Sequence, residues 1–243
     1  MLFFPLGLAE AMAVCVIALA AAMVQAVAGF GLALVAAPLL LLVYGPFVPG
    51  PMMAGGLILT VLILIRDHQH VDVSGLTFSL IGRVIGTAGA AGFLLIASDV
   101  LFDMTFGVLV MFAVILSAAG LQPRPNRKNA LIAGTLSGLM GTISSIGGPP
   151  VALLYQNAGA ARLRGTLAGF FLVGSLVSLL ALAWVGRFGS EEVVLSLFLS
   201  LPIALGFWLG EPLRSRMSDR AVRPLVLTLS FMSAMTVLLR VVF

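Results

Sequence analysis

The amino-acid sequence predicts an all-α integral membrane protein, and two observations carry that prediction. Of the 243 residues, 61% are hydrophobic and only 9% are charged, a composition that cannot give a surface facing water. The charged residues lie in short clusters between apolar runs of about 20 residues, the length that crosses a bilayer as a helix. A transmembrane β-barrel is excluded, because its strands alternate apolar and polar residues in segments of about ten.

Ten apolar segments follow one another along the chain. They cover residues 6–28, 31–44, 52–65, 74–97, 100–121, 130–144, 149–158, 165–186, 192–210 and 221–242. Segments 31–44 and 149–158 are too short to cross about 30 Å of hydrocarbon at about 1.5 Å per residue. Each follows a glycine-rich break, at residues 28–31 and 144–150. We therefore expect two hairpins that each enter and leave the membrane by one face.

Basic residues predict the orientation. If the N-terminus is outside and each hairpin adds no net crossing, ten of the 13 basic residues fall on the inside, as the positive-inside rule requires. These ten are Arg66, Arg124, Arg127, Lys128, Arg162, Arg164, Arg214, Arg216, Arg220 and Arg223. The same topology places both termini outside.

The two halves of the chain resemble each other, which predicts an internal repeat. Residues 1–121 and 130–243 each contain a glycine-rich break, an Ala-Gly helix, a helix with spaced glycines and a Ser-Asp pair, in that order. Residues 122–129 form a basic linker that we expect in the cytoplasm. Each half makes three net crossings, so the second copy is inserted upside down. Each repeat is then a re-entrant broken-helix hairpin plus three spanning helices, an architecture typical of secondary transporters.

The two breaks are the candidate binding site. Backbone groups left unpaired inside a membrane are tolerated only where protein or a water-filled cavity satisfies them. Half-helices that begin near Gly31 and Pro149 would point N-terminal N–H groups at the centre, which suits a small oxyanion. The expected ligands are Gln25, Gly29, Gly31, Thr142, Ser144, Ser145, Gly147 and Gly148. The alternative is that these small residues only let helices pack closely, which is the role we expect for Gly82, Gly86, Gly89, Gly206 and Gly210.

Arg83 is the one cation deep inside a predicted span, about 12 Å from its inner end. Because a buried charge is costly, Arg83 is a candidate for attracting or gating an anion, and snorkelling to the interface is the alternative. Asp67, His68, His70 and Asp72 are close together in the sequence. Ligands this close in a loop more often form a solvated connection, so no metal or cofactor is expected.

The residues present exclude several classes of function. No nucleophile and base set and no Walker loop occurs, so we expect no enzyme. Most basic residues lie in connecting loops, so they report orientation and not a nucleic-acid partner. No carboxylate lies at mid-span, where proton-coupled carriers usually have one. An anion leaving a cell with a negative interior gains about 2.3 kcal/mol per 100 mV, so export needs no coupling ion.

The duplicated breaks, each followed by a proline and an apolar half-helix, resemble the signature of the TauE/SafE family of sulfite exporters and anion permeases of bacterial inner membranes. The two stretches that carry the resemblance are residues 29–40 and 144–150, and the resemblance covers nearly the whole chain. It implies a multi-pass inner-membrane protein that transports sulfite, sulfoacetate or related organosulfur anions. It also implies binding by Gly29, Gly31, Thr142, Ser144, Ser145, Gly147 and Gly148.

The function that we expect is export of a small anionic substrate across the lipid bilayer by alternating access. Two alternatives stay open at this point. One is a proton- or sodium-coupled importer that uses Glu10 or unwound carbonyls as its ion site. The other is a non-transporting scaffold within a membrane complex. The sequence leaves the oligomeric state open.

Overall fold

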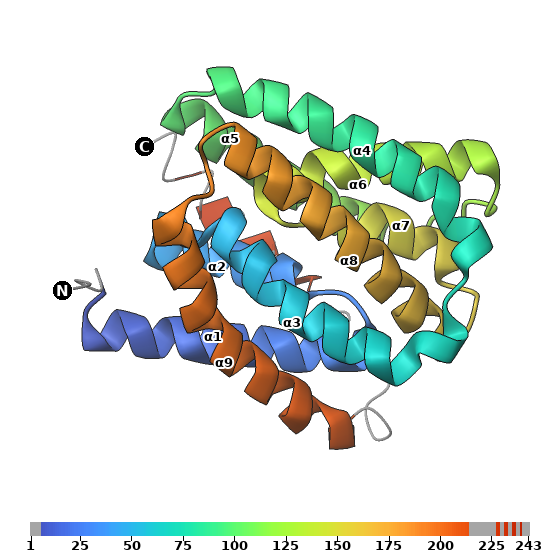
Figure 1. Ribbon diagram of the computed structural model, residues 1–243, viewed down its shortest axis with the longest axis horizontal. Helices are drawn as coiled ribbons and strands as arrows, with labels where there is room; N and C mark the ends of the chain where they lie inside the picture. Colours follow the sequence, from blue (N-terminus) through green and yellow to red (C-terminus); the bar gives the residue numbers. More distant parts are fainter. Residues whose placement is uncertain (1–5, 214–226, 229–230, 233–234, 237–238, 240–243) are drawn as a thin grey trace.

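The computed structural model describes residues 6–213, 227–228, 231–232, 235–236 and 239, and all regular structure in these residues is helical (Figure 1). The α-helices are α1 (Leu8–Ala28), α2 (Leu32–Val43), α3 (Gly50–Asp67), α4 (Val73–Ile96), α5 (Asp99–Ala118), α6 (Arg127–Ser144), α7 (Gly148–Tyr155), α8 (Ala160–Trp184) and α9 (Ser190–Gly210). Three short 3-10 helices are η1 (Gly45–Phe47), η2 (His68–His70) and η3 (Glu211–Leu213). Most of predicted segment 221–242 lies outside the described residues.

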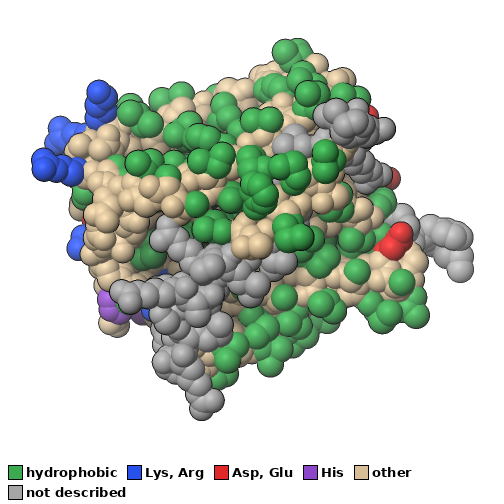
Figure 2. Space-filling view, turned by 180° about the vertical axis from the view of Figure 1, so that it is seen from behind, with side chains coloured by type: hydrophobic (Ala, Val, Ile, Leu, Met, Phe, Trp, Pro, Cys, Tyr) green, Lys and Arg blue, Asp and Glu red, His purple; other side chains and the backbone are tan. Residues whose placement is uncertain are grey.

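The helices confirm a multi-pass membrane protein. Within the described residues, six helical segments are long and apolar enough to cross a bilayer. Figure 2 shows hydrophobic side chains across the middle of one face, with Lys and Arg gathered at one end and an acidic side chain toward the other. The two short segments are separate helices, α2 with 12 residues and α7 with 8, as their lengths predicted.

Helix pairs from opposite halves of the chain form the body of the molecule. Helix α4 packs along α6, α1 packs along α9, and α3 lies between α8 and α9. Gly82 and Gly86 press against the α6 backbone, and Gly206 and Gly210 press against the α1 backbone. A Cβ atom at any of these four positions would meet a backbone oxygen, so the packing role predicted for them is confirmed. Gly89 has no neighbour within 4 Å of the place a Cβ would take, so packing does not explain it.

We call one end of the molecule the basic end, because it carries Arg66, Arg124, Arg127, Arg162 and Arg164 where α3 ends and where α4, α6 and α8 begin. The four ion pairs among the described residues all lie there. Asp72 is the N-cap of α4, where its carboxylate accepts from the Gly75 N–H at 3.1 Å and pairs with Arg162 at 3.0 Å. The gathering of charge agrees with the predicted topology, and which compartment this end faces stays a prediction.

Candidate functional site

The first break lies between α1 and α2. Gly29 ends α1 with φ +85° and donates its N–H to the Gln25 carbonyl at 2.7 Å, and Gly31 precedes α2 with φ +125°. Both angles lie in the left-handed region, where glycine alone is unstrained. The side-chain oxygen of Gln25 accepts from the Leu32 N–H at 3.0 Å. Gln25 is buried, and it joins the end of α1 to the start of α2.

The second break lies between α6 and α7. Ser145 follows α6 with φ +64°, and its hydroxyl donates to the Pro49 carbonyl at the start of α3, at 2.8 Å. The Ser144 hydroxyl donates to the Met140 carbonyl at 2.8 Å, within its own helix. Pro149 and Pro150 occupy the first turn of α7, where a missing N–H costs nothing. The hydrogen bond from Ser145 holds a non-glycine residue in a conformation that side chains rarely adopt.

The two breaks meet at a cavity of about 60 Å³, which has room for a few water molecules or a small ion. Six of the predicted site residues line it: Gln25, Gly31, Arg83, Ser145, Gly147 and Gly148. Three do not, namely Gly29, Thr142 and Ser144. Gly29 packs instead against the aliphatic part of the Arg164 side chain. The hydroxyls of Thr142 and Ser144 are bonded to other protein groups, away from the cavity wall.

The rest of the wall comes from residues that sequence reasoning missed. They are Phe30, Leu32, Ala33 and Leu34 beside the first break, Met52, Met53, Gly56 and Thr60 on α3, Ile146 and Pro149 beside the second break, and Phe171 and Ser175 on α8. Helices α3 and α8 carry no break and no mid-span charge, so nothing in their own sequences marks them as site helices. Their glycines, such as Gly56 on α3, were an available signal, because glycine on a helix face lets another group approach closely.

Arg83 is buried at the side of this cavity, with 3% of its surface exposed. Its Nη1 donates to the Ser137 carbonyl at 2.6 Å and to the Ser137 hydroxyl at 3.0 Å. Its Nη2 donates to the Gly174 carbonyl at 3.3 Å and to the Ser178 hydroxyl at 3.0 Å. Among the described residues, no carboxylate pairs with Arg83 and nothing accepts from its Nε. Arg83 therefore does not snorkel to an interface, because α6 and α8 hold it inside the protein.

Four buried side chains, Thr87, Ser137, Thr142 and Ser178, form what we call the hydroxyl cluster. Thr142 lies 2.8 Å from the Ser178 hydroxyl and donates to Thr87 at 3.2 Å. The Ser137 hydroxyl donates to the carbonyl of Gly147 in the second break at 2.5 Å. The hydroxyl cluster therefore connects the guanidinium of Arg83 to the backbone of that break.

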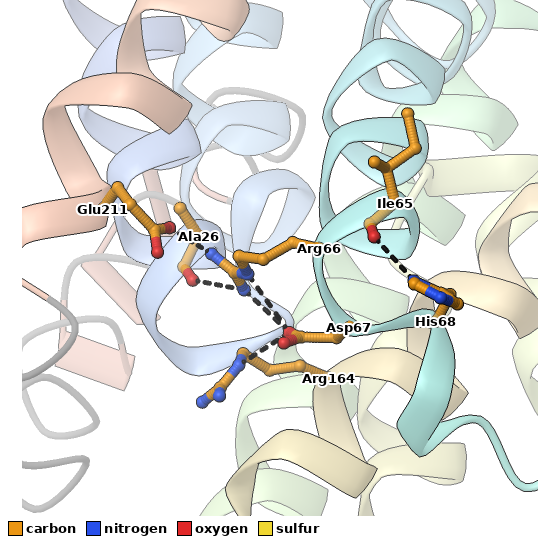
Figure 3. Close-up of polar contacts among 7 residues, drawn as sticks. All are labelled: Ala26, Ile65, Arg66, Asp67, His68, Arg164 and Glu211. Atoms are coloured by element: carbon orange, nitrogen blue, oxygen red, sulfur yellow. Dashed lines mark hydrogen bonds and ion pairs between the residues drawn. The ribbon is translucent and has the colours of Figure 1, made fainter.

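An ion-pair network lies at the basic end, beside the first break (Figure 3). The carboxylate of Asp67 pairs with Arg66 at 3.0 Å and with Arg164 at 3.1 Å. Arg66 also pairs with Glu211 at 2.6 Å and donates to the Ala26 carbonyl, in the last turn of α1, at 3.2 Å. The network therefore ties together the ends of α1, α3 and α9 and the start of α8. His68 contacts only the Ile65 carbonyl in this view, and no group of three potential metal ligands occurs in the described part of the chain.

A multi-pass helical protein with a small, partly polar cavity between two interrupted helices has the architecture of a membrane transporter. The sequence model of the sulfite exporter TauE/SafE family matches residues 14–237, and the chain belongs to this family. The resemblance inferred from the two breaks is thereby confirmed, and the members of this family are transporters. Searches of the curated proteins and of the solved structures gave no match.

Proposed function

We propose that the protein is a permease that moves sulfite or a related small organosulfur anion out of the cell by alternating access through the cavity between the two breaks. One observation carries this proposal more than any other. The cavity wall includes a buried arginine that no carboxylate neutralises among the described residues. A buried cation without a partner is strongly unfavourable, so a site that keeps one is suited to an anion.

Backbone amides add to the attraction for an anion. The first N–H groups of a helix have no intrahelical acceptor and carry a partial positive charge. The N–H of Leu32 is taken by Gln25, and Pro149 and Pro150 have none. The amides of Ala33 and Gly148 remain, since both residues line the cavity and neither amide donates a hydrogen bond within the described part of the chain. We propose these two amides as ligands for the anion, one from each break.

The inverted repeat is part of the proposal, and helix directions support it. Helices α1, α3 and α9 end at the basic end, whereas α6, α8 and α4 begin there. Helices α1, α3 and α4 of the first half thus run opposite to α6, α8 and α9 of the second half, in that order. The cavity wall pairs in the same way, because residues 30–33 of the first break and 146–149 of the second both line it.

Glycine contacts support the same relation. Gly55 of α3 lies against Ile203 of α9, and Gly174 of α8 lies against Arg83 of α4. These contacts relate α3 to α8 and α4 to α9, which is the correspondence that the helix directions require. Two halves of opposite direction around a shared central site provide the two-sided geometry that alternating access needs.

The direction of transport follows from charge. If the basic end faces the cytoplasm, as the positive-inside rule predicts, the membrane potential drives a monovalent anion outward with about 2.3 kcal/mol per 100 mV. The coupled-importer alternative named Glu10 as an ion site. Glu10 is exposed in the first turn of α1, and its carboxylate accepts from the Gly7 N–H at 3.0 Å. That position is far along α1 from the cavity-lining Gln25, so Glu10 is poorly placed to couple an ion to the site.

Transport by the purified protein in liposomes tests the proposal. We expect sulfite efflux when a potassium diffusion potential makes the lumen negative, and little efflux when the potential is collapsed. A Gly148→Leu variant should block the flux by filling the cavity, whereas Ser200→Ala, which removes a hydroxyl bonded within α9 outside the cavity wall, should leave it unchanged. No flux with any small anion refutes the proposal. Accumulation driven only by a proton or sodium gradient would favour the importer.

A further inference from the structure

We propose that Arg83 is a fixed positive charge that restricts the substrate to anions with a single negative charge. The bound anion accepts a hydrogen bond from the Nε–H of this side chain. The inference rests on the proposed function and adds the charge class of the substrate. It also makes Ser137 and Ser178 positioning residues, which act through Arg83 and not on the anion.

The hydrogen bonds of Arg83 leave one donor free. A guanidinium has five N–H donors, two on each Nη and one on Nε. Ser137 supplies two acceptors to Nη1, and Gly174 and Ser178 supply one each to Nη2. The Nε atom is buried and has no partner among the described residues. Because an unpaired buried donor is unfavourable and Arg83 lines the cavity, the Nε–H is the donor that an anion can satisfy.

Three glycines keep the guanidinium where it is. A Cβ atom on Gly141 or Gly147 would lie 2.5 Å from Nη1, and one on Gly174 would lie 2.8 Å from Nε. The protein backbone therefore surrounds the group closely on the α6, α7 and α8 sides. A side chain packed this tightly cannot swing between the two faces of the membrane, so Arg83 acts as a static charge at the site.

The net charge of the site then decides which anions fit. Among the described residues, Arg83 is the one ionisable residue on the cavity wall. The described residues that contact its guanidinium from α6, α8 and the second break are serines, glycines and Phe170, which carry no charge. One negative charge makes the occupied site neutral. A dianion leaves one charge uncompensated in a medium of low dielectric constant, which opposes its binding strongly. For inorganic sulfite, the form transported is therefore hydrogensulfite.

Methanesulfonate and sulfate give a matched test, because they have similar size and shape and differ by one charge. In wild-type proteoliposomes we expect methanesulfonate to compete with sulfite at least about tenfold better than sulfate does. Sulfite flux should also fall as pH rises through neutrality, where the singly charged form gives way to the dianion, while methanesulfonate flux should stay constant. If sulfate competes as well as methanesulfonate, or sulfite flux rises with pH, the single-charge inference is wrong although the transporter stands. If no anion moves, the proposed function itself has failed.

Variants then assign the selectivity to Arg83. Arg83→Gln should weaken competition by methanesulfonate about 10- to 100-fold, the loss expected for a charge-assisted hydrogen bond. Arg187→Gln is the control, because Arg187 also donates to a backbone carbonyl, that of Ala97 at 3.1 Å, but lies outside the cavity wall. Ser178→Ala should reduce the preference for methanesulfonate over sulfate, and Ser178→Thr should restore it. If Arg83→Gln does not fold, the wild-type comparison of the two anions still decides the inference.

Discussion

The ion-pair network at the basic end permits a quantitative prediction for Asp67→Asn. Asp67 is 3% exposed and is the carboxylate shared by Arg66 and Arg164. Replacing one charge of a buried pair costs about 3 to 5 kcal/mol, because the partner is left without its countercharge. Arg66 keeps its ion pair with Glu211 at 2.6 Å, whereas Arg164 loses its ion pair with Asp67, so we expect the lower value, about 3 kcal/mol.

Thermal unfolding in detergent measures this cost. For a chain of this size, about 3 kcal/mol corresponds to a Tm about 6 to 12 °C lower. Asp99→Asn is the matched control, because Asp99 lies in the exposed first turn of α5 and forms no ion pair with any other described residue. The double variant Asp67→Asn with Arg164→Gln should lose less than the sum of the two single variants, since it removes both charges. A Tm within about 2 °C of wild type for Asp67→Asn would show that the network contributes little.

Two further predictions concern the first break and the cap of α4. Gly29→Ala should destabilise the protein by more than about 1 kcal/mol, because φ at this position is +85° and a Cβ atom would lie 2.6 Å from Cγ of Arg164. Gly89→Ala should instead stabilise α4, because no atom lies within 4 Å of the place its Cβ would take. Thermal unfolding of the two variants tests both expectations. Burial raises the pKa of Asp72, but the Gly75 N–H, Ser74 and Arg162 outweigh it, so the net pKa is lowered. A carboxylate with a lowered pKa stabilises the folded protein at pH values above its unfolded pKa of about 3.9, and this stabilisation is lost as pH falls through the folded pKa. Asp72→Asn should therefore lower Tm at neutral pH, and the Tm of this variant should fall less than that of the wild type in acid.

Hydropathy and glycine content were sufficient to predict the spans and the two short helices. Hydrocarbon thickness fixes the length of a spanning helix, so segments 31–44 and 149–158 stood out as too short and became α2 and α7. The glycines at residues 29 and 31 predicted the first break because the chain needs positive φ there, as the structure shows. These predictions depend on local backbone geometry and on the thickness of the bilayer, so they need no knowledge of tertiary contacts.

The cavity wall was only partly predictable, because it depends on helix rotation and tertiary contacts. Ser144 and Ser145 are neighbours in the sequence, yet only Ser145 lines the cavity, since α6 ends between them. The residues from α3 and α8 enter the site only because these helices pack together beside the breaks.

The positive-inside rule, which counts basic residues in loops, did not predict the structural role of Arg66 and Arg164. Arg66 and Arg164 were predicted as residues that set topology, because they flank apolar segments. In the structure they are largely buried and paired with Asp67 beside the first break. A rule that counts charges in loops cannot show which of them become part of the packed protein.

The fixed position of Arg83 also has an electrical consequence for the proposed cycle. Because the guanidinium stays in place, the anion is the charge that moves through the transmembrane field when cargo is carried outward. The reset of the vacant site moves no charge. Turnover should therefore become insensitive to potential under conditions where this reset limits the rate.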